Sequence, residues 1–106
     1  MCGVLNMTTR FKNMYERAKE NLISPSMIYV YENVIYAMEN EGVKLTDDEI
    51  EKVCDFIDSC LGSSDYISVY NLARYFMIQL DEHQTVEDIY KSSISDFVND
   101  AIEFYA

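Results

Sequence analysis

The chain has 106 residues and a formal net charge of −11, from 19 acidic and 8 basic side chains. Its length suits a single domain. Its hydrophobic content of 49% is too high for a disordered acidic tail, which would lack the apolar area to offset its ordering entropy. The charge excludes non-specific nucleic-acid binding, because phosphate contacts need Lys and Arg. A basic protein partner, or solubility alone, accounts for the charge.

The spacing of apolar residues predicts helices in the first part of the chain. Residues 1–7 are expected to form a flexible lead, and a first helix is predicted over residues 8–22, in the basic segment of the chain. A second helix is predicted to begin at Ser24 and Pro25, because serine caps helices and proline suits the first helical turn. Gly42 is placed to end that helix.

The start of the third helix is the strongest local signal. Thr46 and Glu49 have the spacing of a capping box, in which each side chain accepts from the other residue's backbone amide. Leu45 and Ile50 flank this box at the positions of a hydrophobic staple. The sequence therefore predicts a helix that starts after Thr46 and runs to about Leu61.

Two further helices are predicted in the last third of the chain. Ser68 follows a short β-prone stretch and is expected to cap a fourth helix, and Thr85 is expected to cap a fifth. The apolar positions of this fifth helix are Val86, Ile89, Phe97, Val98, Ala101, Ile102 and Tyr105. The fold class is therefore all-α, with residues 8–82 as a helical lobe and residues 83–106 as an acidic amphipathic helix that packs on the lobe or extends it.

No arrangement of residues in the sequence predicts an enzyme, a cofactor or a metal site. Cys54 and Cys60 lie in a helical pattern and are interpreted as apolar packing residues, which suits a reducing compartment. His83, the single histidine, lies in a polar break between helices. No apolar stretch approaches the roughly 18 residues of a membrane span. A cytoplasmic protein without membrane contact is expected.

Two segments resemble an EF-hand of the calmodulin and myosin light chain family. Residues Glu41 to Asp58 resemble the linker and entering helix, and residues Ile67 to Phe76 resemble the β-bridge residue and exiting helix. Phe11 to Tyr15 and Tyr29 to Met38 resemble a weaker first unit, with Tyr29 at the β-bridge position. The resemblance implies a single lobe of four helices built from two degenerate helix-loop-helix units.

The loops of these units depart from the calcium-binding pattern. A calcium loop has 12 residues and closes on a bidentate glutamate. Aligning Ile67 with the β-bridge position puts Asn71 at the closing position, with Cys60 where an acidic ligand belongs. A loop that opened at Asp58 would be too long. Neither loop is therefore expected to bind calcium.

Such a calcium-independent lobe resembles the myosin light chain branch, whose members clasp a basic amphipathic helix. The resemblance implies a similar adaptor for an IQ-type helix of a motor, such as a myosin heavy chain, or of a scaffold. Two alternatives stay open. One is a small acidic inhibitor, encoded by a phage or another mobile element, that binds the basic surface of a nucleic-acid-processing enzyme, and the other is a homodimeric helical protein. The residues predicted to line the partner groove, or to lie in the core beneath it, are Met14, Tyr31, Ile35, Met38, Phe56, Ile57, Phe76 and Met77.

Overall fold

A computed structural model describes residues 16, 19–20, 25–63, 66–81 and 84–106 of the chain. These residues form helices and connecting turns without a β-strand, so the all-α prediction is confirmed. None of the described helices is both long and apolar enough to cross a membrane. The main helices are α3 (Pro25–Glu41), α4 (Asp47–Leu61), α5 (Val69–Asp81), α6 (Val86–Tyr90) and α7 (Ile94–Tyr105).

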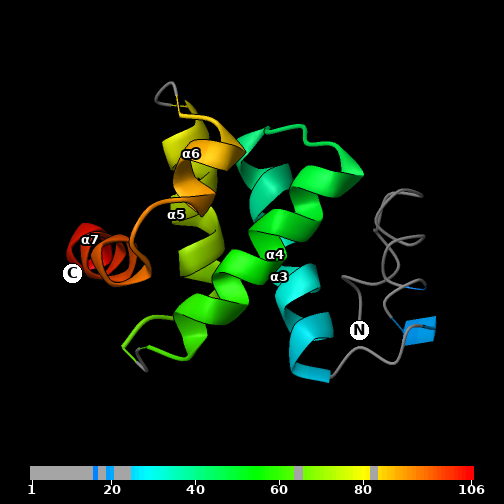
Figure 1. The fold of residues 1–106 in the computed structure, drawn as a ribbon, viewed down its shortest axis with the longest axis horizontal. Helices are drawn as coiled ribbons and strands as arrows, with labels where there is room; N and C mark the ends of the chain where they lie inside the picture. The colour runs from blue at the N-terminus through cyan, green and yellow to red at the C-terminus, as the bar shows by residue number, and fades with distance from the viewer. Residues whose placement is uncertain (1–15, 17–18, 21–24, 64–65, 82–83) are drawn as a thin grey trace.

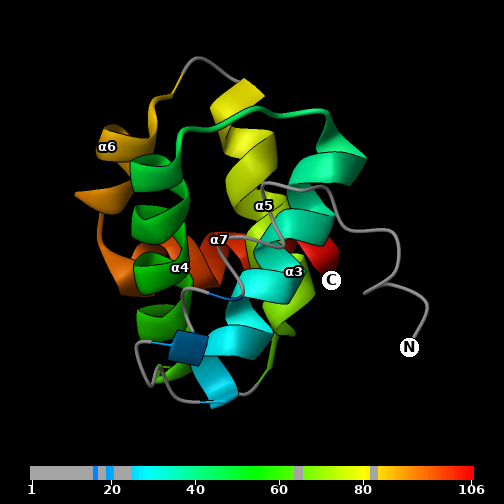
Figure 2. The ribbon, with the colours of Figure 1, turned by 90° about the vertical axis from the view of Figure 1, so that its right-hand side faces the viewer.

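The helices pack around one shared interior. α3 packs mainly against α5, and α4 contacts both of them. The short α6 lies against α4, whereas α7 runs across α4 and α5 rather than along them (Figures 1 and 2). The C-terminal segment therefore covers the side of the α4–α5 pair away from α3.

Helix α3 has the predicted start and end. It begins at Pro25 and stops at Glu41, and Gly42 then adopts a positive φ of 69°. The Val43 amide donates to the Met38 carbonyl over 3.0 Å, as in a Schellman motif. Glycine terminates the helix here because it reaches this left-handed conformation without a Cβ clash. The predicted cap at Ser24 lies outside the described residues.

Helix α4 confirms the predicted capping box. The Glu49 amide donates to Thr46 Oγ1 over 3.2 Å, and the Thr46 amide donates to Glu49 Oε1 over 2.8 Å. Leu45 and Ile50 are both buried in the same core, as expected for a hydrophobic staple. The predicted cap of α5 is also present, because the Asn71 amide donates to Ser68 Oγ over 3.1 Å.

The prediction of one continuous fifth helix is wrong. Thr85 caps α6 as expected, but the helix ends at Tyr90, and Ser93 caps a separate helix, α7. Between them Ser92 Oγ donates to the Ile89 carbonyl over 2.6 Å. Consecutive serines favour such a break because their hydroxyls compete for backbone groups that a helix would use.

The buried side chains of helices α3 to α7 form one hydrophobic cluster in the described part of the chain. The C-terminal segment contributes Val86, Ile89, Phe97, Val98 and Ala101 to this cluster. Residues 84–106 thus belong to the same core as α3, α4 and α5.

The structure also corrects one detail of the EF-hand resemblance. Tyr29, expected at a β-bridge, lies within α3 and is 54% exposed. A residue inside a helix uses its backbone groups for helical bonds and has none left for a bridge. The predicted lead at 1–7, most of the first helix and part of each expected calcium loop lie outside the described residues.

Candidate functional site

The side chains predicted to contact a partner are buried in the interior. Phe76, Met77 and Ile57 are fully buried, and the four others from the described helices are each at most 7% exposed. Those four are Tyr31, Ile35, Met38 and Phe56. The eighth, Met14, lies outside the described residues. The structure therefore assigns seven of these residues to the core, and their contact with a partner stays a prediction.

The two described cysteines are packing residues, as predicted. Cys54 and Cys60 are fully buried on α4 with free thiols. Burial raises the pKa of Cys60 to about 12 and raises the pKa of Cys54 as well, because the interior disfavours a thiolate. These thiols are therefore poor nucleophiles and poor metal ligands.

No group of three His, Cys, Asp or Glu side chains in the described part of the chain is arranged to hold a metal ion. The expectation that neither loop binds calcium stays a prediction. Titration calorimetry of the full chain should give no calcium dissociation constant below about 1 mM, the weak limit for such loops. Tighter binding would contradict the ligand assignment made from Ile67 and Asn71.

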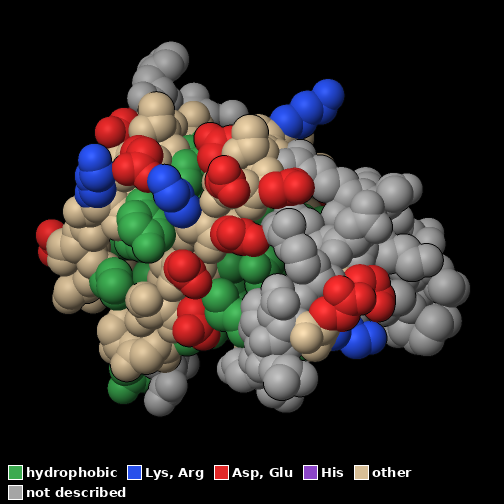
Figure 3. Space-filling view, turned by 45° about the vertical axis from the view of Figure 1, so that its right-hand side comes forward, with side chains coloured by type: hydrophobic (Ala, Val, Ile, Leu, Met, Phe, Trp, Pro, Cys, Tyr) green, Lys and Arg blue, Asp and Glu red, His purple; other side chains and the backbone are tan. Residues whose placement is uncertain are grey.

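The most distinctive surface is the exposed side of α4. We call Asp47, Asp48, Glu51, Asp55 and Asp58 the acidic row; all five side chains are exposed. With 3.6 residues per turn they fall within about a third of the helix circumference and extend over about 16 Å. Figure 3 shows acidic side chains running across this face, with hydrophobic side chains beside them.

Three described cations form salt bridges with carboxylates outside the acidic row. Lys52 on α4 forms a salt bridge with Glu87 on α6. Lys91 lies 3.5 Å from the same carboxylate, and Arg74 on α5 lies 3.2 Å from Glu41 on α3. The Lys52 hydrogen bond lowers the pKa of Glu87, and the same bond raises the pKa of Lys52. The Lys52–Glu87 and Arg74–Glu41 pairs connect two helices each, whereas the Lys91–Glu87 pair lies within the α6 segment.

A pocket of about 190 Å³ opens beside the acidic row, where α4 meets α6 and α7. It is lined by Asp55, Phe56, Ser59, Tyr90 and Ile94. The Phe56 ring is 3% exposed, whereas Tyr90 is 40% exposed, and their ring centroids are 6.4 Å apart. The pocket thus combines a buried aromatic floor, an exposed aromatic wall and a carboxylate.

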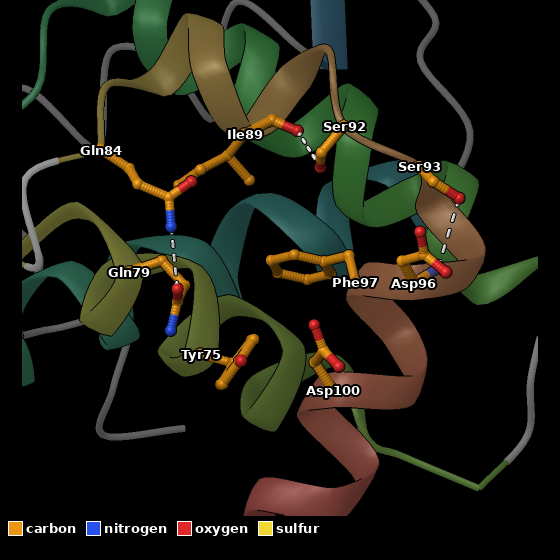
Figure 4. A pocket seen from close by; sticks show the side chains of 9 residues that line it. All are labelled: Tyr75, Gln79, Gln84, Ile89, Ser92, Ser93, Asp96, Phe97 and Asp100. Atoms are coloured by element: carbon orange, nitrogen blue, oxygen red, sulfur yellow. Dashed lines mark hydrogen bonds between the residues drawn. The ribbon is translucent and has the colours of Figure 1, made fainter.

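A second pocket, of about 160 Å³, lies between α5, α6 and α7 (Figure 4). Its polar side chains bond mainly within the protein: Gln84 Nε2 donates to Gln79 Oε1 over 2.9 Å, and Ser93 Oγ accepts from the Asp96 amide over 3.3 Å. Phe97 and Ile89 form its apolar part. The first bond joins the segment before α6 to α5 and the second caps α7, so both have a structural role.

The candidate site consists of the acidic row and the pocket beside it, and sequence reasoning identified neither. The acidic row has a sequence signal, because acids recur at intervals of three and four residues from Asp47 to Asp58. The pocket has none, since Asp55 and Tyr90 come from different helices and meet only through tertiary packing.

Comparison with protein-family models, with curated proteins and with solved structures finds no match to this chain. The resemblance to EF-hand proteins therefore stays a prediction.

Proposed function

We propose that this protein is a binding module that docks on a basic surface of another protein through the acidic row. The single observation that carries the proposal is the alignment of five exposed carboxylates on one face of α4. Like charges three and four residues apart cost a helix a few tenths of a kcal/mol per pair. Asp47 and Asp48 lie in the first turn of α4, where carboxylates favour the helix dipole. Asp55 and Asp58 lie towards the negative end of the helix, where carboxylates are unfavourable, so a role outside folding accounts for their presence.

A folded basic surface suits this module better than a clasped helix. A clasp of the light-chain kind would use the apolar residues now buried in the core. Exposing one large side chain such as Phe76 costs about 1.5–3 kcal/mol, and several would have to move together. The acidic row is already on the surface. The favoured partner is thus a folded protein whose Lys and Arg side chains form a positive patch, such as an enzyme that binds nucleic acid.

Affinity capture from the source cell, followed by mass spectrometry and purification of the captured protein, supplies the partner for a binding measurement. The test variant is Asp48→Asn/Asp58→Asn, and the matched control is Asp96→Asn/Asp100→Asn on α7, with the same change in charge. The test variant should bind the purified partner about fivefold more weakly, and the control should bind like the wild type. Equal loss in both variants would mean that only the net charge matters and would contradict the proposal.

The light-chain-like adaptor makes a different prediction for the same protein. It should bind an isolated basic amphipathic peptide equally in EDTA and in calcium, and the NMR signals of Phe76 and Met77 should shift because the core opens. Docking on the acidic row should leave those core signals in place. A captured myosin-type heavy chain together with such core shifts would overturn the folded-surface proposal.

A further inference from the structure

The pocket beside the acidic row has the composition of a site for a guanidinium group. Phe56 supplies an apolar floor that cannot move freely, because its ring packs edge-on against Phe97 at 4.9 Å and Phe76 at 5.6 Å. Tyr90 supplies a partly exposed ring, and Asp55 supplies a carboxylate at the rim. A cavity of about 150 Å³ can hold a benzene molecule, so a pocket of about 190 Å³ has room for the end of a long side chain.

The pocket is held in shape from both sides. The Lys52–Glu87 salt bridge joins α4 to α6 one turn before Asp55. Ile94 is half-buried at the start of α7, where Ser93 fixes the helix start. Lys52, the cation on the preceding turn, is engaged by Glu87 and leaves the Asp55 carboxylate to an incoming charge.

We propose that this pocket receives an arginine side chain from the basic surface of the partner, an inference that rests on the proposed function. The planar guanidinium stacks on the Tyr90 ring and donates to the Asp55 carboxylate, while its methylene stem covers Phe56 and Ile94. Arginine fits better than lysine because its flat, weakly hydrated cation stacks on aromatic rings and donates in a fork. The acidic row attracts the basic surface, and the pocket fixes its position.

The direct test uses a probe in place of the partner. Nα-acetyl-arginine amide is titrated into the isotope-labelled full chain, and the NMR signals of Tyr90, Phe56 and Ile94 are followed. Nα-acetyl-citrulline amide, which has the same shape without the charge, is the control ligand. The arginine probe should give saturable shifts at these three residues, and the citrulline probe should give none. Equal shifts with both probes, or shifts spread over all acidic side chains, would overturn the proposal.

Paired variants of Tyr90 separate the effect of its aromatic face from the effect of its apolar packing. Tyr90→Phe keeps an aromatic face and should bind the arginine probe like the wild type. Tyr90→Leu keeps an apolar side chain without the π-face and should bind about two- to fivefold more weakly. Asp55→Asn should weaken the probe by a similar factor, and Asp96→Asn should have no effect. Thermal unfolding checks that each variant is folded. Unchanged affinity in Tyr90→Leu would contradict the stacking role.

The experiment distinguishes this inference from the proposed function. If Asp48→Asn/Asp58→Asn loses the partner while Tyr90→Leu keeps full partner affinity and the arginine probe does not bind, the docking function stands and the pocket inference fails. If the arginine probe binds at Tyr90 and Asp55 but partner binding is indifferent to the acidic row, the proposed function fails and the pocket remains a guanidinium site. Loss of partner affinity in both sets of variants supports both proposals.

Discussion

At the scale of single residues, Gly42 illustrates how one backbone conformation sets a helix end. Its φ of 69° lies in the left-handed region, and a Cβ placed there would meet no atom within 4 Å. The cost of a side chain is therefore conformational rather than steric. Gly62, which follows α4, has an ordinary helical φ of −74°. The two glycines form a matched pair for an experiment.

We predict that Gly42→Ala lowers the free energy of unfolding by about 1–2 kcal/mol, because a Cβ strains the left-handed conformation. Gly62→Ala should be neutral or slightly stabilising, since its Cβ would lie 3.5 Å from the Ser59 carbonyl oxygen, an ordinary contact. Urea unfolding followed by circular dichroism measures both values. Equal effects in the two variants would show that the positive φ of Gly42 carries no special cost.

The buried thiols predict how reactivity depends on folding. In a Cys2→Ser variant, a thiol reagent at about pH 8 should react with Cys54 and Cys60 only as fast as the protein unfolds, because the folded thiols stay protonated. For Cys60 the pKa rises from 9.0 to about 12. The unfolded state therefore releases its proton first, and stability should fall as pH rises from 9 towards 12.

The rate of thiol modification, measured in the folded state and in denaturant, tests the prediction of slow reaction. Urea midpoints measured at increasing pH test whether stability falls as predicted. Rapid reaction of both thiols without denaturant would mean that α4 opens readily. A midpoint that rises with pH in this range would contradict the assignment of burial as the cause.

At the scale of elements, α7 packs on the rest of the protein through aromatic side chains that differ in how deeply they are buried. Phe97 is 6% exposed and has ring neighbours on α4 and α5, with centroid distances of 4.9 Å to Phe56 and 5.3 Å to Tyr75. Phe104 lies further along the same helix, is 56% exposed and contacts Tyr75 at 5.4 Å. The first turns of α7 therefore pack more firmly against α4 and α5 than its last turn does.

We predict that Phe97→Ala lowers the free energy of unfolding by about 3–5 kcal/mol, through lost burial and an unfilled cavity. Phe104→Ala should cost well under half as much, because most of its ring already contacts water. Denaturant unfolding of the full chain compares the two. A similar cost for both would show that α7 is fastened along its whole length, against the observed difference in burial.

At the scale of the whole molecule, the net charge of −11 acts on a body of 33 × 26 × 25 Å. At about 10 mM salt the screening length is about 30 Å, so carboxylates on opposite sides of the molecule repel one another, whereas at about 150 mM it is about 8 Å. Much of the surface repulsion should therefore disappear at physiological ionic strength.

We predict that raising NaCl from about 10 to about 150 mM increases the midpoint of thermal unfolding by a few degrees, because screening relieves repulsion in the compact state. KCl at the same ionic strength should act equally, which separates screening from specific ion binding. A lower midpoint in salt would mean that the salt bridges of Lys52, Lys91 and Arg74 outweigh the repulsion.

The sequence by itself determined the local features of this fold. The caps at Thr46, Ser68 and Thr85, the stop at Gly42 and the buried stripes of α3, α4 and α5 follow from interactions between residues a few positions apart. Such signals are visible in the chain because both partners are close in sequence. The break at Ser92 was local too, but the long apolar pattern around it masked the signal.

Only the tertiary structure decided the rest. It placed in the core seven residues for which the sequence left core and partner groove open. An apolar stripe has the same spacing whether it faces a partner or another helix of the same chain. It also brought Asp55 of α4 beside Tyr90 of α6 and left the acidic row on the surface. Those arrangements depend on contacts between residues far apart in sequence, for which local periodicity carries no information.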